Sequence, residues 1–560
     1  MQPNMIQLYE KGERQRGAVA PPAKTLSTRG PLQEILLAAH SRSSAKYFTG
    51  IKKIVYLLVV LSYFFSACSK EFLEKVPEST VTTGNFYKTE AQFEQALVGA
   101  YAAVRNVKGS IAAWTMAEMR ADNAFYEYNV NNRGLAYQQR EDIDGFLDDN
   151  ANDLIAGYYN SSYIAIARAN SILGAIAASE LNQEAVNRFV GEAKFIRALL
   201  YFDLVRFYGG VPLYLEAVAS AESAYIPRST AEQTYAAIEA DLSDAVAKLS
   251  STSFPQSGRA SKGAARTLLG DVYLAQKKYD LAEAEFLSVT QMGYDLLPHY
   301  ASVYELGNKN SRESIFELQF QQGNQGQQSN FLYPFLPLAE YVSLITGITS
   351  QNRQGGGWNV PTQEFIESYE TGDERLDASI AIAEGTGPIG SMIVESVKSP
   401  VGYITPAGKR SYAFIKKYLH PHSLENNTDD NFPVYRYAEV LLSLAETLNE
   451  QNKSGEALPY LNEVRRRAGL GDIGELDKTL LRDIIAHERR VELAFENKRW
   501  TDLLRTGKAL EVMQQNGVYL KARFNNLLPQ SYQVTAQKLV YAIPQREVLI
   551  GGLAQNPGYE

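Results

Sequence analysis

The sequence predicts a mainly α-helical fold, in which tetratricopeptide-like helical hairpins support a loop-rich region with a few short strands. Three observations lead to this prediction. Apolar residues recur at helical spacing over long segments, two segments share one helical-repeat pattern, and residues 294–433 replace both with Gly, Gln, Asn and aromatic residues. With 45% hydrophobic and 21% charged residues, the composition is that of a folded globular chain.

The N-terminal region has the pattern of a targeting segment. Two lysines precede an uncharged run over 54–67, and small residues close this run. This order is typical of a secretory signal, and the run is shorter than the roughly 20 residues of a transmembrane helix. We therefore predict a disordered or non-native extension at 1–50, a signal peptide at 51–67 and a single domain over 68–560.

Cys68 is the only cysteine of the chain, so the sequence allows no intrachain disulfide and no zinc site built on cysteines. It follows Ser66 and Ala67 and resembles the bacterial lipobox, where a signal is cleaved and the cysteine receives lipid. Phe65 stands where the lipobox usually has Leu. We predict that Cys68 carries an acyl anchor, since more than one acyl chain gives stable membrane attachment. The alternative is a buried cysteine behind a membrane anchor.

Two long helices are predicted at 153–178 and 186–208. Both segments place apolar residues at helical spacing, and Phe195 and Phe202 share one face of the second. The glycines and proline of 209–212 are expected to end that helix.

A tetratricopeptide-like hairpin follows. The segments 269–273 ("LGDVY") and 282–286 ("AEAEF") match the repeat pattern L-G-x₂-Y…A-x₃-F. Small residues at Gly270 and Ala282 would let two helices approach closely, with the larger aromatic side chains, among them Phe286, filling the groove between them.

The same spacing recurs in 444–448 and 457–461, which predicts a second hairpin of this type. Hairpins are therefore expected within 153–292 and 434–506, separated by the loop-rich insertion 294–433. Loops held by a rigid scaffold commonly carry function.

Two strands and one further helix complete the prediction. Strands are expected at 314–320 and 411–418 inside the insertion, and the chain returns to helix over 477–508. In this last segment Glu488, Glu492 and Glu496 would share one helix face. We interpret them, with their neighbouring arginines, as an ion-pair network, while the apolar side chains at Val491, Phe495 and Trp500 face the core.

The charge balance argues against nucleic acid as a partner. The net charge is −8, and residues 1–67 hold nine Lys and Arg against three Glu, so the remainder carries −14. Nucleic-acid phosphates require a basic face.

The sequence also lacks the G-x-S-x-G, H-E-x-x-H and Walker motifs. We therefore expect no catalytic residues and no enzymatic activity.

The acidic run at 140–153 is a candidate metal site. Its aspartates surround Gly145: Asp142, Asp144, Asp148, Asp149 and Asp153. Oxygen-rich runs can hold Ca²⁺, but this one lacks the terminal Glu of an EF-hand. We interpret it as a solvated helix start, with structural calcium as the alternative, and expect no other metal or cofactor. His420 and His422 flank a proline and are interpreted as a loop.

Several segments together resemble the SusD/RagB family of Bacteroidetes outer-membrane lipoproteins, and they span nearly the whole chain behind the lipobox. They are 191–213, 264–286, 356–362, 435–450, 461–470, 488–505 and 543–559. The resemblance implies about four tetratricopeptide-like hairpins below a loop-rich ligand face. It also implies a lipid-anchored, surface-exposed protein of the outer membrane that acts as the lid of a TonB-dependent transporter resembling SusC.

The ligand implied by the resemblance is an oligosaccharide or polysaccharide, and in some members a peptide. Oligopeptide uptake is therefore the alternative function, and a helical-repeat scaffold that binds only protein is a further one. No nucleic acid is expected among the partners.

Sugar binding needs flat apolar faces and planar polar groups, and Tyr supplies both a face and a hydroxyl. The chain has 35 Tyr against three Trp. Two regions combine the right residue types, one at 119–137 and one inside the insertion. The candidate ligand contacts are Asn123, Tyr126, Tyr128, Asn132, Arg133 and Tyr137 in the first region, and Tyr333 and Trp358 in the second. The alternative for Asn123 is that it holds a turn, and the alternative for Trp358 is that it packs in the core.

Overall fold

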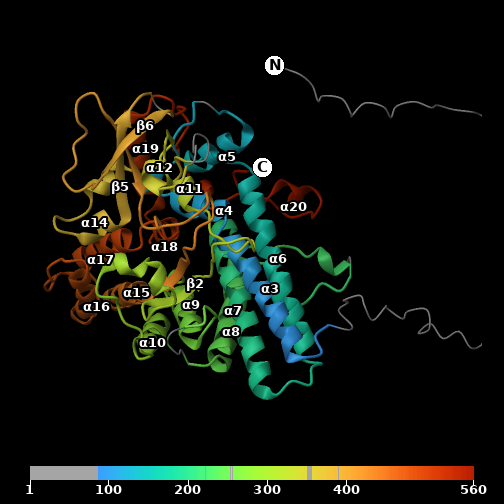
Figure 1. Ribbon diagram of the computed structural model, residues 1–560. Helices are drawn as coiled ribbons and strands as arrows, with labels where there is room; N and C mark the ends of the chain where they lie inside the picture. The colour runs from blue at the N-terminus through green and yellow to red at the C-terminus, as the bar shows by residue number, and fades with distance from the viewer. Residues whose placement is uncertain are drawn as a thin grey trace, which may run out of the picture. The chain divides into compact units, whose positions relative to one another are not determined.

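Long helices lie side by side along the first half of the folded chain (Figure 1). The computed structural model describes residues 86–559, apart from 131, 221, 252–253, 255, 350–355 and 389. The first helices are α3 (Glu90–Lys108), α4 (Ile111–Trp114), α5 (Leu135–Asp144), α6 (Asp153–Ile176), α7 (Gln183–Tyr208) and α8 (Ala231–Lys248). The extension, the signal peptide and Cys68 of the sequence analysis lie outside the described residues.

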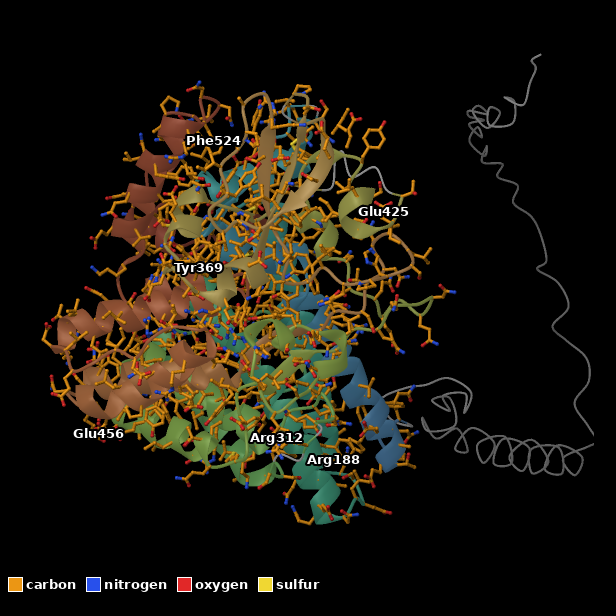
Figure 2. The ribbon with its side chains drawn as sticks, turned by 60° about the vertical axis from the view of Figure 1, so that its left-hand side comes forward. Arg188, Arg312, Tyr369, Glu425, Glu456 and Phe524 are labelled. Atoms are coloured by element: carbon orange, nitrogen blue, oxygen red, sulfur yellow. The ribbon has the colours of Figure 1, made fainter. Side chains whose placement is uncertain are left out.

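Side-chain caps fix where these helices begin. Asn152 accepts from the backbone N–H groups of Leu154 and Ile155 at the start of α6, and Asn182 accepts from that of Ala185 at the start of α7. The two predicted long helices are confirmed, and α7 begins a few residues earlier than expected because of this cap. Arg188 then joins α7 to α3 through ion pairs with Glu90 and Glu94 (Figure 2).

Helical hairpins continue after α8. Their helices are α9 (Lys262–Ala275), α10 (Tyr279–Thr290), α15 (Tyr437–Glu450), α16 (Ser454–Arg467) and α17 (Lys478–Glu492). α9 packs against α10, and α15 packs against α10, α16 and α17. The chain therefore closes its helical layer across the insertion, as the matched repeats predict, and the mainly α-helical fold class is confirmed.

Gly270 explains how closely α9 and α10 approach. A Cβ atom at this position would lie 2.7 Å from Cε1 of Phe286, whose ring is buried. The predicted role of the small residue is therefore confirmed, because any larger side chain would displace the ring.

The insertion is built on short strands and short helices. They are β2 (Ser314–Leu318), α11 (Leu332–Phe335), β3 (Ala339–Glu340), α12 (Ser343–Thr346), β4 (Val360–Pro361), α13 (Gln363–Glu367), α14 (Glu374–Ser379), β5 (Ile380–Thr386), β6 (Met392–Lys398), β7 (Arg410–Ile415) and β8 (Phe432–Arg436). One sheet has the order β3-β6-β5-β7, and β2 pairs with β8 antiparallel. The two predicted strands correspond to β2 and β7, while β3, β4, β5, β6 and β8 were not predicted.

The C-terminal segment corrects one prediction. The predicted helix over 477–508 breaks after Glu492, resumes as α18 (Arg499–Arg505) and is followed by α19 (Ala509–Arg523) and α20 (Gln545–Leu549). In the break Phe495 and Asn497 adopt left-handed backbone angles, with φ of 63° and 61°. Their backbone N–H groups donate to the buried carboxylate of Glu118, each at 3.1 Å. The helix can break here because these buried N–H groups have an acceptor outside the helix.

A buried ion-pair core joins the insertion to the helices. Its members are Glu313, Arg375, Lys417, Arg436, Arg467, Glu488, Glu492 and Glu496, and every one of these side chains is nearly inaccessible to solvent. Glu492 lies between the guanidinium groups of Arg436 and Arg375, at 2.6 and 3.1 Å. The predicted network is confirmed, although Glu496 belongs to the break and not to the helix.

No helix in the described part of the chain is both long enough and apolar enough to cross a membrane.

Candidate functional site

The structure brings the two candidate regions of the sequence together. β1 (Ala124–Phe125) pairs antiparallel with β4, so Phe125 lies opposite Val360. The backbone N–H of Glu127 also donates to the carbonyl of Gly357 at 2.8 Å. The segment after β1 therefore runs along the segment before β4, although more than 200 residues separate the two in sequence.

An aromatic cluster forms where these segments meet. The rings of Tyr126 and Trp358 contact edge to face with centroids 6.1 Å apart. The guanidinium of Arg140, from α5, lies 3.9 Å from the Trp358 ring centroid and 4.9 Å from that of Tyr137. Tyr126 and Trp358 are only 6% and 4% exposed, so they form the base of the cluster, while Tyr137 is partly exposed.

An exposed edge of polar and aromatic side chains borders this cluster. Arg133 stacks on Tyr128 with 4.2 Å between the guanidinium carbon and the ring centroid, and it pairs with Glu141 through two hydrogen bonds. Asn132 accepts from the backbone N–H of Gly134 at 3.1 Å and so fixes the intervening turn. We call the set Tyr128, Asn132, Arg133 and Tyr137 the ligand face, since all four are at least partly accessible.

Burial removes the other predicted contacts from this surface. Asn123 is fully buried, accepts from Nε of Arg490 at 2.8 Å and donates to Glu118. It holds its turn, which was the alternative role. Trp358 and Tyr126 pack beneath the ligand face and offer no open ring surface to a ligand. The burial of these three side chains favours supporting roles beneath the surface over direct contact with a ligand.

Tyr333 lies apart from the ligand face, in another buried cluster. Its ring is 2% exposed and packs with side chains of the insertion sheet. The Tyr333 hydroxyl and Nε2 of His422 are 2.8 Å apart, and Nδ1 of His422 lies 2.8 Å from the carbonyl oxygen of His420. The two histidines therefore fasten a loop, as the sequence analysis proposed.

The acidic run before α6 is integrated into the fold. Asp144 accepts from the backbone N–H of Tyr126 and from the hydroxyl of Tyr532, and Asp148 pairs with the buried Arg120. The prediction of a solvated helix start is therefore wrong for these two residues. Among the residues that the structure describes, no three His, Cys, Asp or Glu side chains gather as metal ligands would.

Arg140 is a site residue that the sequence analysis missed. Tyr137 and Arg140 are three positions apart on α5 and therefore share a helix face. Two buried polar atoms here, Nε of Arg140 and Nε1 of Trp358, have no hydrogen-bond partner among the described residues. Such groups are rare in folded proteins and mark places where water or a ligand can bind.

Glu127 is a second residue of the candidate site that was not predicted from the sequence. Its burial predicts that the stability of the fold depends on pH. Burial raises the pKa of its carboxyl to about 7, above the ordinary value near 4.5. The folded state thus holds a proton that the unfolded state releases between about pH 4.5 and 7, so stability falls as the pH rises through this window.

We expect Glu127→Gln to stabilise the protein by about 2–3 kcal/mol at pH 8 and by much less at pH 5, because glutamine has no charge to desolvate. Thermal unfolding at both pH values measures this. Glu475→Gln, at an exposed position, serves as the control. An equal gain at both pH values would show that the Glu127 carboxyl does not titrate as the burial implies.

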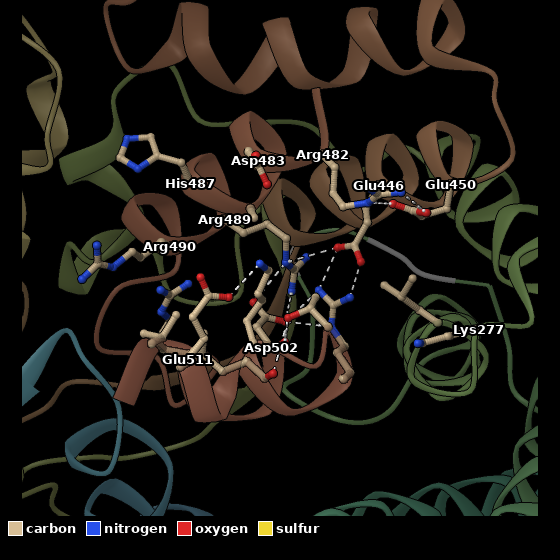
Figure 3. A pocket seen from close by; sticks show the side chains of 18 of the residues that line it. Lys277, Glu446, Glu450, Arg482, Asp483, His487, Arg489, Arg490, Asp502 and Glu511 are labelled. Carbon is tan, nitrogen blue, oxygen red and sulfur yellow. Dashed lines mark hydrogen bonds and ion pairs between the residues drawn. The ribbon is translucent and has the colours of Figure 1, made fainter. Parts of the chain in front are cut away.

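A charged cavity of about 590 Å³ lies between α15, α17, α18 and α19 (Figure 3). Its charged side chains largely pair with one another. Arg489 and Arg505 both contact Asp502, at 3.1 and 2.8 Å, and Arg505 also pairs with Glu446. Ion pairs that join the helices line most of this cavity, and the partly exposed Tyr279 is the one aromatic ring of a tyrosine in its lining.

Two models of known families match the chain in succession. The family described as "Starch-binding associating with outer membrane" matches residues 71–274, and the family described as "SusD family" matches residues 312–559. The chain therefore belongs to the SusD/RagB family. The first of these descriptions associates its family with the outer membrane.

Individual relatives cover most of the chain. The SusD-like protein P2 of Formosa agariphila is 29% identical over 500 residues, which are 85% of this chain and 95% of that relative. A solved laminarin-binding SusD-like protein has 26% identity and a TM-score of 0.68, covering 84% of this chain and all of the other. Surface glycan-binding protein A from Bacteroides thetaiotaomicron, solved with laminarihexaose, has 21% identity and a TM-score of 0.65, covering 83% of this chain and 99% of the other, and shows the same fold.

Proposed function

We propose that this protein is a lipid-anchored, surface-exposed lipoprotein that captures glycans and delivers them to a TonB-dependent transporter of the SusC type. The observation that carries the proposal is the ligand face. Tyr128 and Tyr137 offer partly accessible rings, and Arg133 and Asn132 offer planar polar groups beside them. This combination suits pyranose rings, whose C–H faces stack on aromatic rings while their hydroxyls bond to the polar groups.

Two further observations support the proposal. The relative that shares 26% identity over 84% of this chain is described as laminarin-binding. The lipobox-like sequence before Cys68 supports attachment of the mature chain to a membrane through lipid. The family membership supports the outer membrane as that membrane, and a barrel transporter as the partner.

A binding screen tests the ligand class. We expect the purified protein to be retarded in native gels that contain one neutral polysaccharide of a panel including laminarin and starch. We expect no saturable binding of mixed oligopeptides in a parallel titration. Binding of peptides alone would move the protein to the oligopeptide branch of the family, and binding of neither ligand class would contradict glycan capture.

Co-purification tests the transporter partner. A lid over a barrel needs an interface larger than the standard value of roughly 1,600 Å². We therefore expect the protein to leave native membranes in mild detergent together with a barrel protein in equal amount. If the protein elutes alone under conditions that keep other outer-membrane complexes intact, the proposed delivery to a transporter is wrong.

A further inference from the structure

The glutamine-rich loop of the insertion lines a groove that is separate from the proposed ligand face. Two cavities, of about 460 and 510 Å³, line the side of α3 and share Arg105 and Phe320. Gln321 and Gln327 line the first, and Gln328 and Asn330 line the second. We call this pair of cavities the glutamine groove. Each has the volume typical of a small-molecule site.

Phe320 supplies an apolar surface at the centre of the groove. Its ring is partly exposed and lines both cavities. The guanidinium carbon of Arg105 lies 5.6 Å from the ring centroid, and Phe331 packs against the ring edge to face at 5.9 Å. The ring is therefore held in place while part of it stays open to the groove.

The loop over the groove is fixed by many hydrogen bonds. The backbone N–H of Gln322 donates to Asp429 and that of Gly323 to Asn427, at 3.0 and 2.8 Å, and Gln321 bonds to Gln327 across the loop. The turn that holds Asn427 contains Glu425, which Figure 2 labels. A loop fixed in this way needs little ordering when a ligand binds, which favours affinity.

Apart from Asp153, whose exposed carboxylate lines the second cavity and accepts from Nε2 of Gln139, the groups left for a ligand are mainly uncharged amides. The ammonium of Lys309 pairs with Asp429 at 3.1 Å, and Arg105 donates to the carbonyl of Gln319, so these charges have partners within the protein. Oε1 of Gln328 is buried and has no hydrogen-bond partner among the described residues. Amides beside a flat ring fit the hydroxyls and C–H faces of a neutral sugar better than they fit an ion.

We propose that the glutamine groove binds a second stretch of a neutral oligosaccharide chain, in continuation of the ligand face. The link between the two is Ile111, which packs against the aromatic cluster of Tyr126 and Trp358 and also lines the groove. The inference rests on the proposed glycan capture and extends it. A polymer long enough to lie on both surfaces is held at two points, and its affinity then exceeds that of a short fragment.

Calorimetric titration tests the groove, with laminarin and the other neutral polysaccharides of the panel and with hexasaccharides derived from them. The groove variant combines Phe320→Leu with Gln328→Ala, and the face variant combines Tyr128→Ala with Arg133→Ala. We expect two hexasaccharide sites on the native chain and one on each variant. We expect the dissociation constant for the polymer to rise at least tenfold in either variant.

A second groove variant and one control complete this test. Asn106→Ala with Gln327→Ala changes only exposed amides that line the groove, so it reports on binding even if Phe320→Leu disturbs packing. Gln183→Ala with Asn187→Ala changes amides at the start of α7 and should leave binding unchanged.

The outcomes separate the groove from the proposed function. Unchanged polymer affinity and stoichiometry in both groove variants would overturn the groove while leaving glycan capture intact. Loss of all glycan binding in the face variant would also overturn the groove. If the groove were a second site, it would still bind glycan in that variant. If a peptide and no glycan bound the native chain in a groove-dependent way, the groove would be a protein-docking site and the inference would be wrong. If no glycan and no peptide bound, the groove and glycan capture would both fall.

Discussion

Glu492→Ala is expected to destabilise the fold by about 3–5 kcal/mol, because removal of one partner leaves buried charges uncompensated. The Glu492 carboxylate lies between Arg436 and Arg375 and also pairs with Arg467. All of these side chains are nearly inaccessible to water. Chemical denaturation monitored by circular dichroism measures the loss as a shift of the midpoint.

The pairing also fixes the sign of the pH effect. The neighbouring arginines hold the pKa of Glu492 well below its ordinary value, against the opposing effect of burial. A carboxylate with a lowered pKa in the folded state contributes stability that is present above the unfolded pKa and is lost as the pH falls. The variant should therefore differ most from the native protein at neutral pH.

Glu511→Ala is the matched control for this prediction. Glu511 pairs with Lys508 at 2.9 Å, but both side chains are more than half exposed. Exposed pairs contribute at most about 1 kcal/mol. A loss of similar size in the two variants would show that the buried ion-pair core does not hold the insertion onto the helices.

Trp358→Ala is expected to have the second large effect, on stability and on ligand binding together. The indole is buried beneath the ligand face, between Tyr126 and Arg140. Its truncation leaves a cavity and should cost about 3–5 kcal/mol. It also removes the surface that orients Arg140 and Tyr137, so we expect glycan affinity to fall by at least tenfold in a titration of the still-folded variant.

Trp358→Phe is the conservative variant for this test. A phenyl ring keeps a flat face for Arg140 and most of the apolar volume, so we expect smaller losses of both stability and affinity. If Trp358→Ala bound glycan as tightly as the native protein, the aromatic cluster would have a purely structural role and the ligand would bind elsewhere.

The helical scaffold could be predicted from the sequence because the patterns that indicate it are local. The hairpin of Gly270 and Phe286 needs a small residue and a ring at a fixed spacing, and both are visible along the chain. The break after Glu492 could not be predicted from a local pattern. It depends on the carboxylate of Glu118, which lies almost 380 residues away in sequence and accepts the N–H groups that the break releases.

The candidate site could be predicted only in part, for the same reason. The segment that holds Tyr128 and Arg133 shows its tyrosines, asparagines and arginine together, so it could be found from composition. Whether each ring is open or buried depends on the pairing of β1 with β4, which no local pattern indicates. Trp358 and Asn123 were therefore candidates for contact, and burial by distant segments gives them supporting roles.

The face variant, Tyr128→Ala with Arg133→Ala, provides the most direct measurement of glycan capture. Both side chains lie at the surface, so the variant should unfold at nearly the native temperature. Calorimetric titration of the native protein with the polysaccharide selected by the screen should show saturable binding that weakens at least tenfold in this variant. Equal binding by the native protein and a correctly folded face variant would contradict the claim that this surface captures glycan.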